Sequence, residues 1–113
     1  MSDTVQGFVA LPPDAPAQVA ARLLVEVRDV SLADAASIVV GAQVQTDVPL
    51  SPGGRIPFRV LLPDLDPAAS YGLRVHVDMA GAGTVEADDM INTRSVPVVP
   101  GAGQELLAPV TRV

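Results

Sequence analysis

The side chains best suited to acid–base or ligand chemistry gather in one strand-like segment, residues 71–79. His76 is the only histidine of the chain, and Arg74 and Asp78 stand two positions to either side of it. Residues two apart in a strand point to the same face, so these three side chains form a polar stripe. One interpretation is a small-ligand site, or an enzyme in which Asp78 orients His76 as a general base. We favour a solvated outer sheet face with weakly interacting charges, because no nucleophile motif or oxyanion donor accompanies the histidine.

Two acidic pairs, Asp64 with Asp66 and Asp88 with Asp89, offer the carboxylate oxygens that calcium prefers. Neither pair has the residue spacing of a calcium-binding loop, and turn formation explains the first pair. One histidine and no cysteine argue against a zinc site. The short glycine clusters lack the spacing, and the following helix, of a nucleotide-binding loop. The sequence therefore predicts no metal, no cofactor and no catalytic residue.

The composition is typical of a β-rich domain with an aliphatic core. The 113 residues fit one domain over 1–113, and 49% of them are hydrophobic although only 3% are aromatic. The mean hydropathy of +0.38 is high for a chain of this size. Nine glycines and eleven prolines indicate frequent turns. Valine, leucine, isoleucine and alanine must therefore build the core.

The charge of the chain excludes some classes of partner. Seven arginines, no lysine and 13 acidic residues give a formal net charge of −6. Nucleic acids and anionic membrane surfaces both require clustered positive charge, so neither is expected as a partner. The absence of cysteine excludes disulfides and thiol catalysis.

Residues 1–13 lack the basic segment, the apolar segment and the lipidated cysteine of an exported lipoprotein precursor. The apolar runs elsewhere are shorter than a membrane span, so no transmembrane segment is expected. The sequence as given predicts a cytoplasmic chain that remains where it is made, or a chain from which a signal peptide has been removed.

Alternating apolar and polar residues predict short strands separated by turn residues. The clearest case is 20–30, where Leu23, Val25 and Val27 share one face and Arg22 and Glu26 the other. Residues 31–37 are expected to form a turn or a single helical turn. Strands are predicted at 5–11, 20–30, 38–46, 56–62 and 71–79, with one or two in 84–99 and a proline-interrupted strand in 104–113. Seven or eight strands without a helix predict an all-β, immunoglobulin-like antiparallel β-sandwich.

Some apolar side chains fall on faces that the alternation places outward. In 38–46 the pattern puts Val44 on the inner face and Gln43 and Gln45 on the outer face with Val39. Leu24 and Leu61 are outward by the same rule. An apolar outer face is compatible with a homo-oligomer that covers it.

The segment that leads into residue 71 has the pattern of a tyrosine corner. Tyr71, the only tyrosine, has an apolar ring for the core and a hydroxyl that needs a partner when buried. In sandwich domains this hydroxyl bonds upstream backbone and fixes the corner. Asp66 and Pro67 shape the loop that supplies the partner, so all three residues are expected to be structural.

The run Asp-Val-Ser-Leu-Ala-Asp-Ala at 29–35 is the most distinctive motif of the chain. It resembles the YbaY-type bacterial lipoproteins, the family that also includes the YscW-type pilotins of type III secretion. Weaker similarities follow in order at 5–7, 56–58, 66–75 and 92–98, so the resemblance covers about residues 5–99.

This resemblance implies a β-sandwich with a non-enzymatic role at the bacterial envelope, in the periplasm or at the outer membrane. In the pilotin branch that role is to bind or escort a protein. Asp29, Ser31 and Asp34 can each bond local backbone N–H groups and cap a short turn, so we interpret them as structural. We therefore expect a non-catalytic binding or structural module whose partner is a protein, bound through a sheet edge, or a second copy of the chain.

Overall fold

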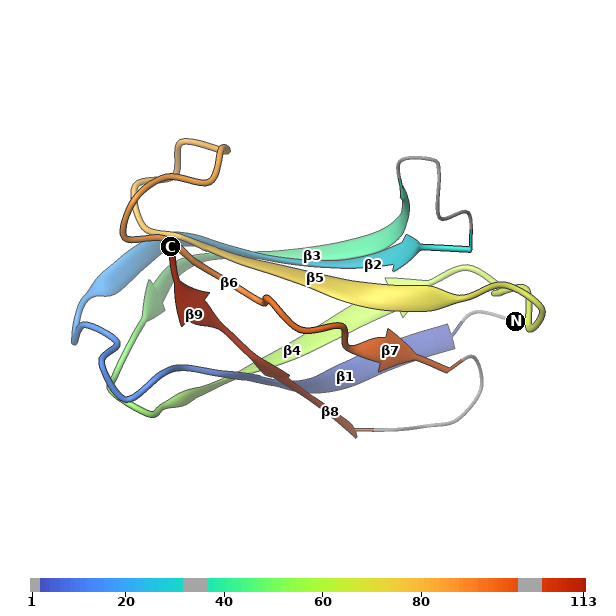
Figure 1. The fold of residues 1–113 in the computed structure, drawn as a ribbon, viewed down its shortest axis with the longest axis horizontal. Helices are drawn as coiled ribbons and strands as arrows, with labels where there is room; N and C mark the ends of the chain where they lie inside the picture. The colour runs from blue at the N-terminus through green and yellow to red at the C-terminus, as the bar shows by residue number, and fades with distance from the viewer. Residues whose placement is uncertain (1–2, 32–36, 100–104) are drawn as a thin grey trace.

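Within residues 3–31, 37–99 and 105–113, which the computed structural model describes, nine strands form two β-sheets that face one another (Figure 1). The smaller sheet has the order β4–β1–β8, formed by β1 (Asp3–Ala10), β4 (Arg55–Leu62) and β8 (Glu105–Pro109). The larger sheet has the order β3–β2–β5–β6–β9. Along this order lie β2 (Val19–Asp29), β3 (Ile38–Pro49), β5 (Tyr71–Asp78), β6 (Met90–Ile91) and β9 (Thr111–Arg112), and a sixth strand, β7 (Pro97–Val98), pairs with β5 beside this order. The all-β prediction is confirmed.

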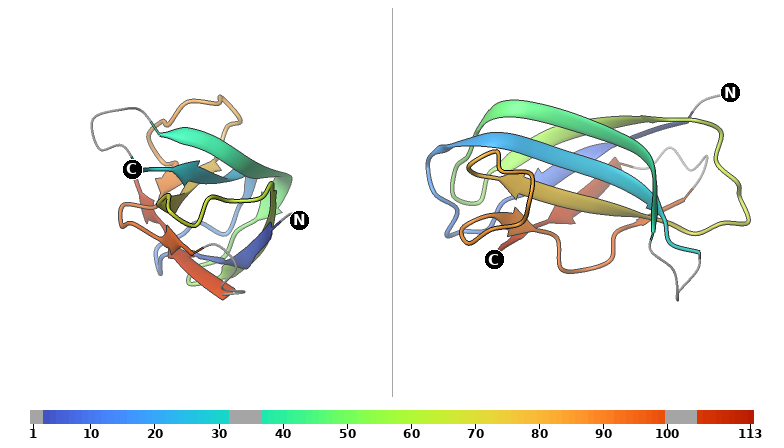
Figure 2. Two further views of the ribbon diagram at one scale, coloured as in Figure 1. Left: turned by 90° about the vertical axis from the view of Figure 1, so that its right-hand side faces the viewer. Right: turned by 90° about the horizontal axis from the view of Figure 1, so that it is seen from above.

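Strand β5 is central to the larger sheet. It pairs with β2 along its whole length, while β6 and β7 share its other edge. Seen from above, β3, β2 and β5 lie side by side over the strands of the smaller sheet (Figure 2). The side chains of β5 that point away from the smaller sheet therefore lie on an outer face.

One strand pair departs from the antiparallel prediction. Strands β1 and β8 run parallel, with Gln6 opposite Glu105 and Ala10 opposite Pro109. The chain reaches β8 from β7 in the other sheet, so no tight hairpin fixes the direction of the pairing.

The core is aliphatic, as the composition predicts. Leu23, Val25 and Val27 of β2 are fully buried, and they face Val9 and Val60 of the smaller sheet within one cluster. Along β4, buried and exposed residues alternate strictly, which is the period-2 pattern read from the sequence.

The face assignment for β3 is wrong beyond its first residues. Val27 of β2 pairs with Gly41 and Arg28 with Val39, so Val40 is the extra residue of a β-bulge. One extra residue moves the side chains that follow it, here those of 41–46, to the opposite face. Val44 is consequently 54% exposed, although the alternation placed it inward.

The same reversal turns two glutamines toward the neighbouring strand of the other sheet. The N–H of Arg59 donates to Gln43 Oε1 at 2.9 Å, and Gln45 Nε2 donates to the carbonyl oxygen of Pro57 at 2.9 Å. These bonds satisfy backbone groups on the open edge of β4, where unpaired groups invite association with other chains.

The turn predicted at 31–37 lies mostly at 32–36, outside the described residues, and so does Asp34. Among the described residues, no helix is long and apolar enough to cross a membrane.

Candidate functional site

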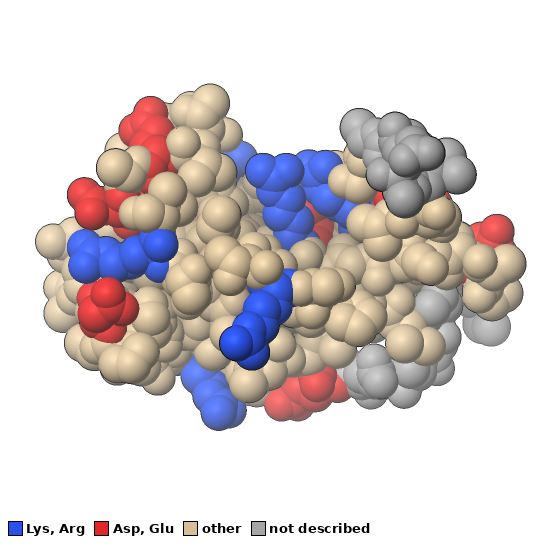
Figure 3. Space-filling model, viewed as in Figure 1, with Lys and Arg blue, Asp and Glu red and all other residues tan. Residues whose placement is uncertain are grey.

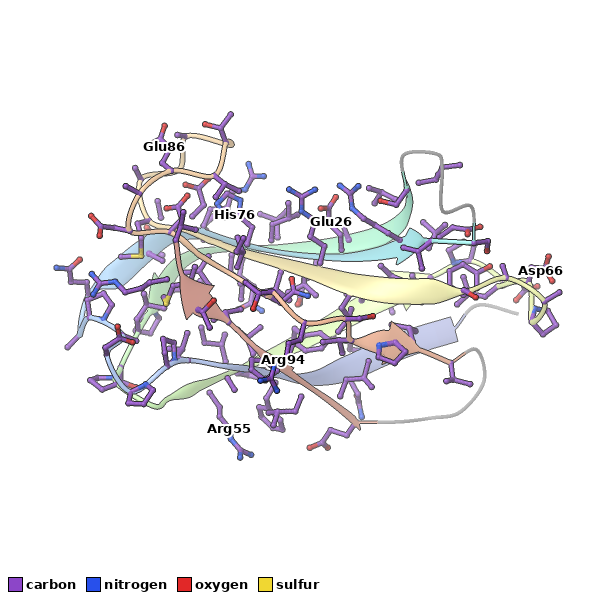
Figure 4. The ribbon with its side chains drawn as sticks, viewed as in Figure 1. Glu26, Arg55, Asp66, His76, Glu86 and Arg94 are labelled. Carbon is purple, nitrogen blue, oxygen red and sulfur yellow. The ribbon has the colours of Figure 1, made fainter. Side chains whose placement is uncertain are left out.

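The polar stripe of β5 lies under the segment that connects β5 to β6, residues 79–89. This segment rises above the larger sheet after the end of β5 (Figure 1). In Figure 4, His76 lies at the foot of the segment and Glu86 near its top. The outer face of β5 is therefore covered at one end and open toward the other.

The expectation of a solvated face is wrong at two of the three stripe residues. His76 is 4% exposed and Asp78 is 1% exposed, whereas Arg74 is exposed. His76 Nε2 lies 2.8 Å from Asp89 Oδ2, and Asp89 is itself 2% exposed. The carboxylate bonded to His76 therefore comes from the far end of the covering segment, and not from Asp78.

Asp78 binds the start of the covering segment through its backbone. The N–H groups of Gly81 and Ala82 donate to Asp78 Oδ1 at 2.8 and 3.2 Å, and the N–H of Gly83 donates to Oδ2 at 2.9 Å. Gly81 and Gly83 have φ values of 75° and 84°, a backbone region that glycine adopts without a steric penalty. This local sequence folds into a tight cradle around one buried carboxylate.

Asp89 binds the other end of the segment. Its Oδ1 accepts from the N–H of Met79 at 2.9 Å, and its Oδ2 accepts from the N–H of Glu86 at 3.0 Å. Burial acts to raise the pKa of Asp89, but the hydrogen bonds from His76 and these two N–H groups outweigh it. The net effect holds the pKa of Asp89 below its ordinary value, so the folded state favours the ionised carboxylate.

His76, Asp78 and Asp89 are close enough to suggest a metal site, since one ligand atom from each lies within 4.8 Å of the others. All four carboxylate oxygens of the two aspartates already accept hydrogen bonds from backbone N–H groups. The hydrogen bonds tie both carboxylates to the backbone of the covering segment. The arrangement is therefore suited to holding this segment over β5.

Tyr71 lies at the start of β5 with its ring 7% exposed. The N–H of Asp66 donates to the Tyr71 hydroxyl at 3.0 Å, which is the contact expected of a tyrosine corner. Asp66 also accepts from the N–H of Ala68 at 2.9 Å through its side chain, and Pro67 lies in that turn. These contacts join the loop before β5 to the strand itself.

Removal of this hydroxyl gives a simple test of the corner. Tyr71→Phe keeps the buried ring but leaves the N–H of Asp66 without its partner. We expect the free energy of unfolding to fall by about 1 kcal/mol, measured by urea denaturation. A variant as stable as the parent protein would show that the hydroxyl contact contributes nothing to the corner.

Asp29 and Ser31 join the end of β2 to the same loop. Asp29 Oδ1 accepts from the N–H of Ser31 at 2.9 Å, and Ser31 Oγ accepts from the N–H of Ser70 at 2.9 Å. The hydrogen bonds from the Ser31 side chain and backbone hold the pKa of Asp29 below its ordinary value. The N–H of Val30 donates to the carbonyl oxygen of Ser70 at 2.8 Å, so the two segments are joined twice.

The structural contacts of two residues were not predicted from the sequence. One is Asp89 as the partner of His76. The other is Asn92, whose Oδ1 accepts from the N–H of Val75 at 2.7 Å and whose Nδ2 donates to the carbonyl oxygen of Leu73 at 3.0 Å. The amide of Asn92 thus replaces a strand partner of β5 between β6 and β7. Both contacts join residues 13 to 19 positions apart, and no local pattern signals them.

The open part of the outer face forms a groove of about 400 Å³ beside the covering segment. Strands β2 and β5 form its floor and residues 83–85 form one wall. Figure 3 shows arginine side chains in the hollow at the top of the molecule, next to the raised segment. The lining residues are Leu24, Glu26, Arg28, Arg74, His76, Gly83, Thr84 and Val85.

Comparison with known proteins gives the family and the fold. No curated protein matches the sequence significantly. A solved structure, described as that of an alternative pilotin from the type II secretion system of Vibrio cholerae, superposes with a TM-score of 0.71 over 98% of each chain. Its sequence is 17% identical, so this similarity shows the fold alone. The family model described as "Type III secretion system lipoprotein chaperone (YscW)" matches residues 1–105. The chain therefore belongs to the YscW family, which confirms the family predicted from the Asp-Val-Ser-Leu-Ala-Asp-Ala run.

Proposed function

We propose that this protein is a non-catalytic, chaperone-type module that binds a protein client of a bacterial secretion system at the cell envelope. The observation that carries the proposal is the match of residues 1–105 to a family of secretion-system lipoprotein chaperones. A chaperone acts by binding another protein, and this requires an accessible surface and no reacting groups.

The contacts of the polar stripe support a role without catalysis. A general base needs a nitrogen or oxygen that can reach a substrate proton. His76 is buried against Asp89, and the oxygens of Asp78 and Asp89 are bonded to backbone N–H groups. The alternative is an enzyme or small-ligand site built on Arg74, His76 and Asp78. Of these three side chains, Arg74 is the one exposed to a substrate or ligand, so the alternative is less well supported.

The exposed apolar side chains support a protein as the partner. Val39 and Val44 of β3 are 42% and 54% exposed, and Leu61 of β4 is 67% exposed. A second copy of the chain could cover such an apolar surface instead of a different protein. The net charge of −6 remains an argument against nucleic acid as the partner.

Affinity purification tests the proposal. The tagged protein is expressed in the source organism, and captured proteins are quantified by mass spectrometry against a tagged β-sandwich of unrelated sequence. We expect a component of a secretion system to be enriched in a fixed ratio to the tagged protein. If no such component is enriched, and the protein itself sediments as an oligomer on dilution, self-association would replace client binding as its function.

A further inference from the structure

The groove on the outer face of β2 and β5 differs in charge from the rest of the molecule. The chain as a whole carries 13 acidic residues against seven arginines. Among the described residues, the groove is lined by two arginines, Arg28 and Arg74, and by one acidic residue, Glu26. Its lining therefore carries a positive balance on a strongly acidic protein.

Glu26, the acidic residue in the described part of the lining, is already paired with an arginine. Arg28 Nη2 lies 3.1 and 3.3 Å from the two carboxylate oxygens of Glu26, and Arg28 Nη1 donates to Ser37 Oγ at 3.0 Å. Glu26 is 9% exposed, so this pair is a largely buried part of the floor. It leaves Arg74 as the accessible charge of the lining.

Arg74 is opposite Glu26 in the register of β5 with β2. Its side chain is exposed, and it makes no hydrogen bond or ion pair with any residue in the described parts of the chain. Arg28 Nε is also buried without a hydrogen-bond partner there. The exposed guanidinium of Arg74 can bind a carboxylate with two parallel hydrogen bonds.

Apolar side chains lie beside these charges. Leu24, half-buried, lines the groove, and Val85 on the wall is 40% exposed. Val44 of β3 pairs with Leu24 and extends the apolar surface at 54% exposure. Asp78 and Asp89 hold the wall in place through backbone bonds, so little ordering of the protein is needed when the groove is filled.

We infer that this groove binds an acidic segment of the protein client, with a glutamate or aspartate of the segment on Arg74 and a neighbouring apolar side chain on Leu24 and Val85. The inference rests on the proposed function and adds the surface and the chemistry of the bound segment. Charge complementarity decides between possible occupants, because a basic or purely apolar segment would leave Arg74 without a partner.

Fluorescence anisotropy with a defined probe tests the inference. The probe is a fluorescein-labelled peptide with the core Leu-Glu-Leu-Glu-Leu, and its counterparts carry glutamine or lysine in place of glutamate. We expect saturable binding of the glutamate peptide and binding at least about tenfold weaker for the other two. We expect Arg74→Glu to weaken binding of the glutamate peptide by about tenfold, since it replaces an attraction with a repulsion.

Arg94→Glu is the matched control. It changes the net charge by the same amount, and Arg94 is exposed on the other side of the larger sheet from His76 and Glu26 (Figure 4). Binding to this variant should equal that of the parent protein. Equal weakening by both variants, equal affinity for the glutamate and glutamine peptides, or no binding of the glutamate peptide would overturn the inference. The inference would also be overturned if Arg74→Glu still bound the glutamate peptide as the parent protein does but lost binding to phosphatidylglycerol vesicles.

Failure of the groove inference can be distinguished from failure of the proposed function. If affinity purification captures a secretion-system component equally with the parent protein and with Arg74→Glu, client binding stands and the groove is the wrong surface. If no client is captured by either protein, the proposed function itself fails.

Discussion

Asp89→Asn is expected to lower the free energy of unfolding at neutral pH by about 3 kcal/mol. Asp89 accepts hydrogen bonds from His76 and from the N–H groups of Met79 and Glu86 while being 2% exposed. An asparagine places two N–H donors where a carboxylate oxygen accepts, so at least one buried donor loses its partner. Loss of one member of a buried charged network typically costs ~3–5 kcal/mol. Urea denaturation followed by circular dichroism measures the change.

The matched control is the neighbouring aspartate. Asp88 is exposed, and its side chain makes a surface ion pair with Arg112 at 3.5 Å. Its φ of 74° is a conformation that asparagine tolerates, so Asp88→Asn keeps the backbone. We expect a change of less than about 1 kcal/mol for this variant. Similar losses for both variants would mean that the buried contacts of Asp89 do not stabilise the fold.

The cost of Asp89→Asn should depend on pH in a defined direction. The pKa of Asp89 is depressed in the folded state, so its stabilisation is present above the pKa of unfolded aspartate, about 4. It is lost as the pH falls through the folded-state value. The stability gap between the parent protein and the variant should therefore be full at pH 7 and shrink below about pH 4. A gap that widened as the pH fell below about 4 would contradict the assigned ionisation.

Gly7→Ala is the second change with a large expected effect. Gly7 of β1 is opposite Leu106 of β8, and a Cβ at this position would collide with the backbone carbonyl of Leu106. Backbone cannot yield as a flexible side chain can, so β8 must shift or detach. We expect a loss of about 3 kcal/mol, which corresponds to a fall in Tm of roughly 10–20 °C.

Gly72 provides the comparison for this substitution. A Cβ at Gly72 in β5 would lie 3.7 Å from the carbonyl oxygen of Val96, an ordinary contact. Alanine also has less conformational entropy to lose than glycine. Gly72→Ala should therefore leave the Tm unchanged or raise it slightly. A Tm for Gly7→Ala within a few degrees of the parent protein would show that the parallel pairing of β1 and β8 is looser than the structure indicates.

Features set by local sequence were predictable. Period-2 alternation over 20–30 predicted a strand that the structure places at Val19–Asp29. The contact between Tyr71 and Asp66 spans five residues, so a short motif was enough to indicate it. Burial of alternate aliphatic side chains also explains why β4 was predictable, since its buried and exposed residues alternate strictly.

Features set by one inserted residue or by distant contacts were not predictable. The bulge at Val40 reverses the faces of β3, whereas the alternation in 38–46 favours the opposite assignment, with Val44 inward. The burial of His76 depends on how residues 79–89 fold back over β5, which requires the contacts of Asp78 and Asp89. In the sequence, Asp88-Asp89 has the appearance of a strand break.

Nuclear magnetic resonance of the labelled protein, titrated with a segment of the proposed client, is the most direct test of binding through the outer face of β2 and β5. The ¹H–¹⁵N spectrum would be recorded with arginine Nε signals included, during titration with the segment. We expect the largest shifts at Leu24, Thr84 and Val85 and at the Arg74 side chain, with Arg94 unchanged. Shifts confined to the opposite sheet, β4–β1–β8, would show that the client binds elsewhere and that the arginine-lined groove is not its surface.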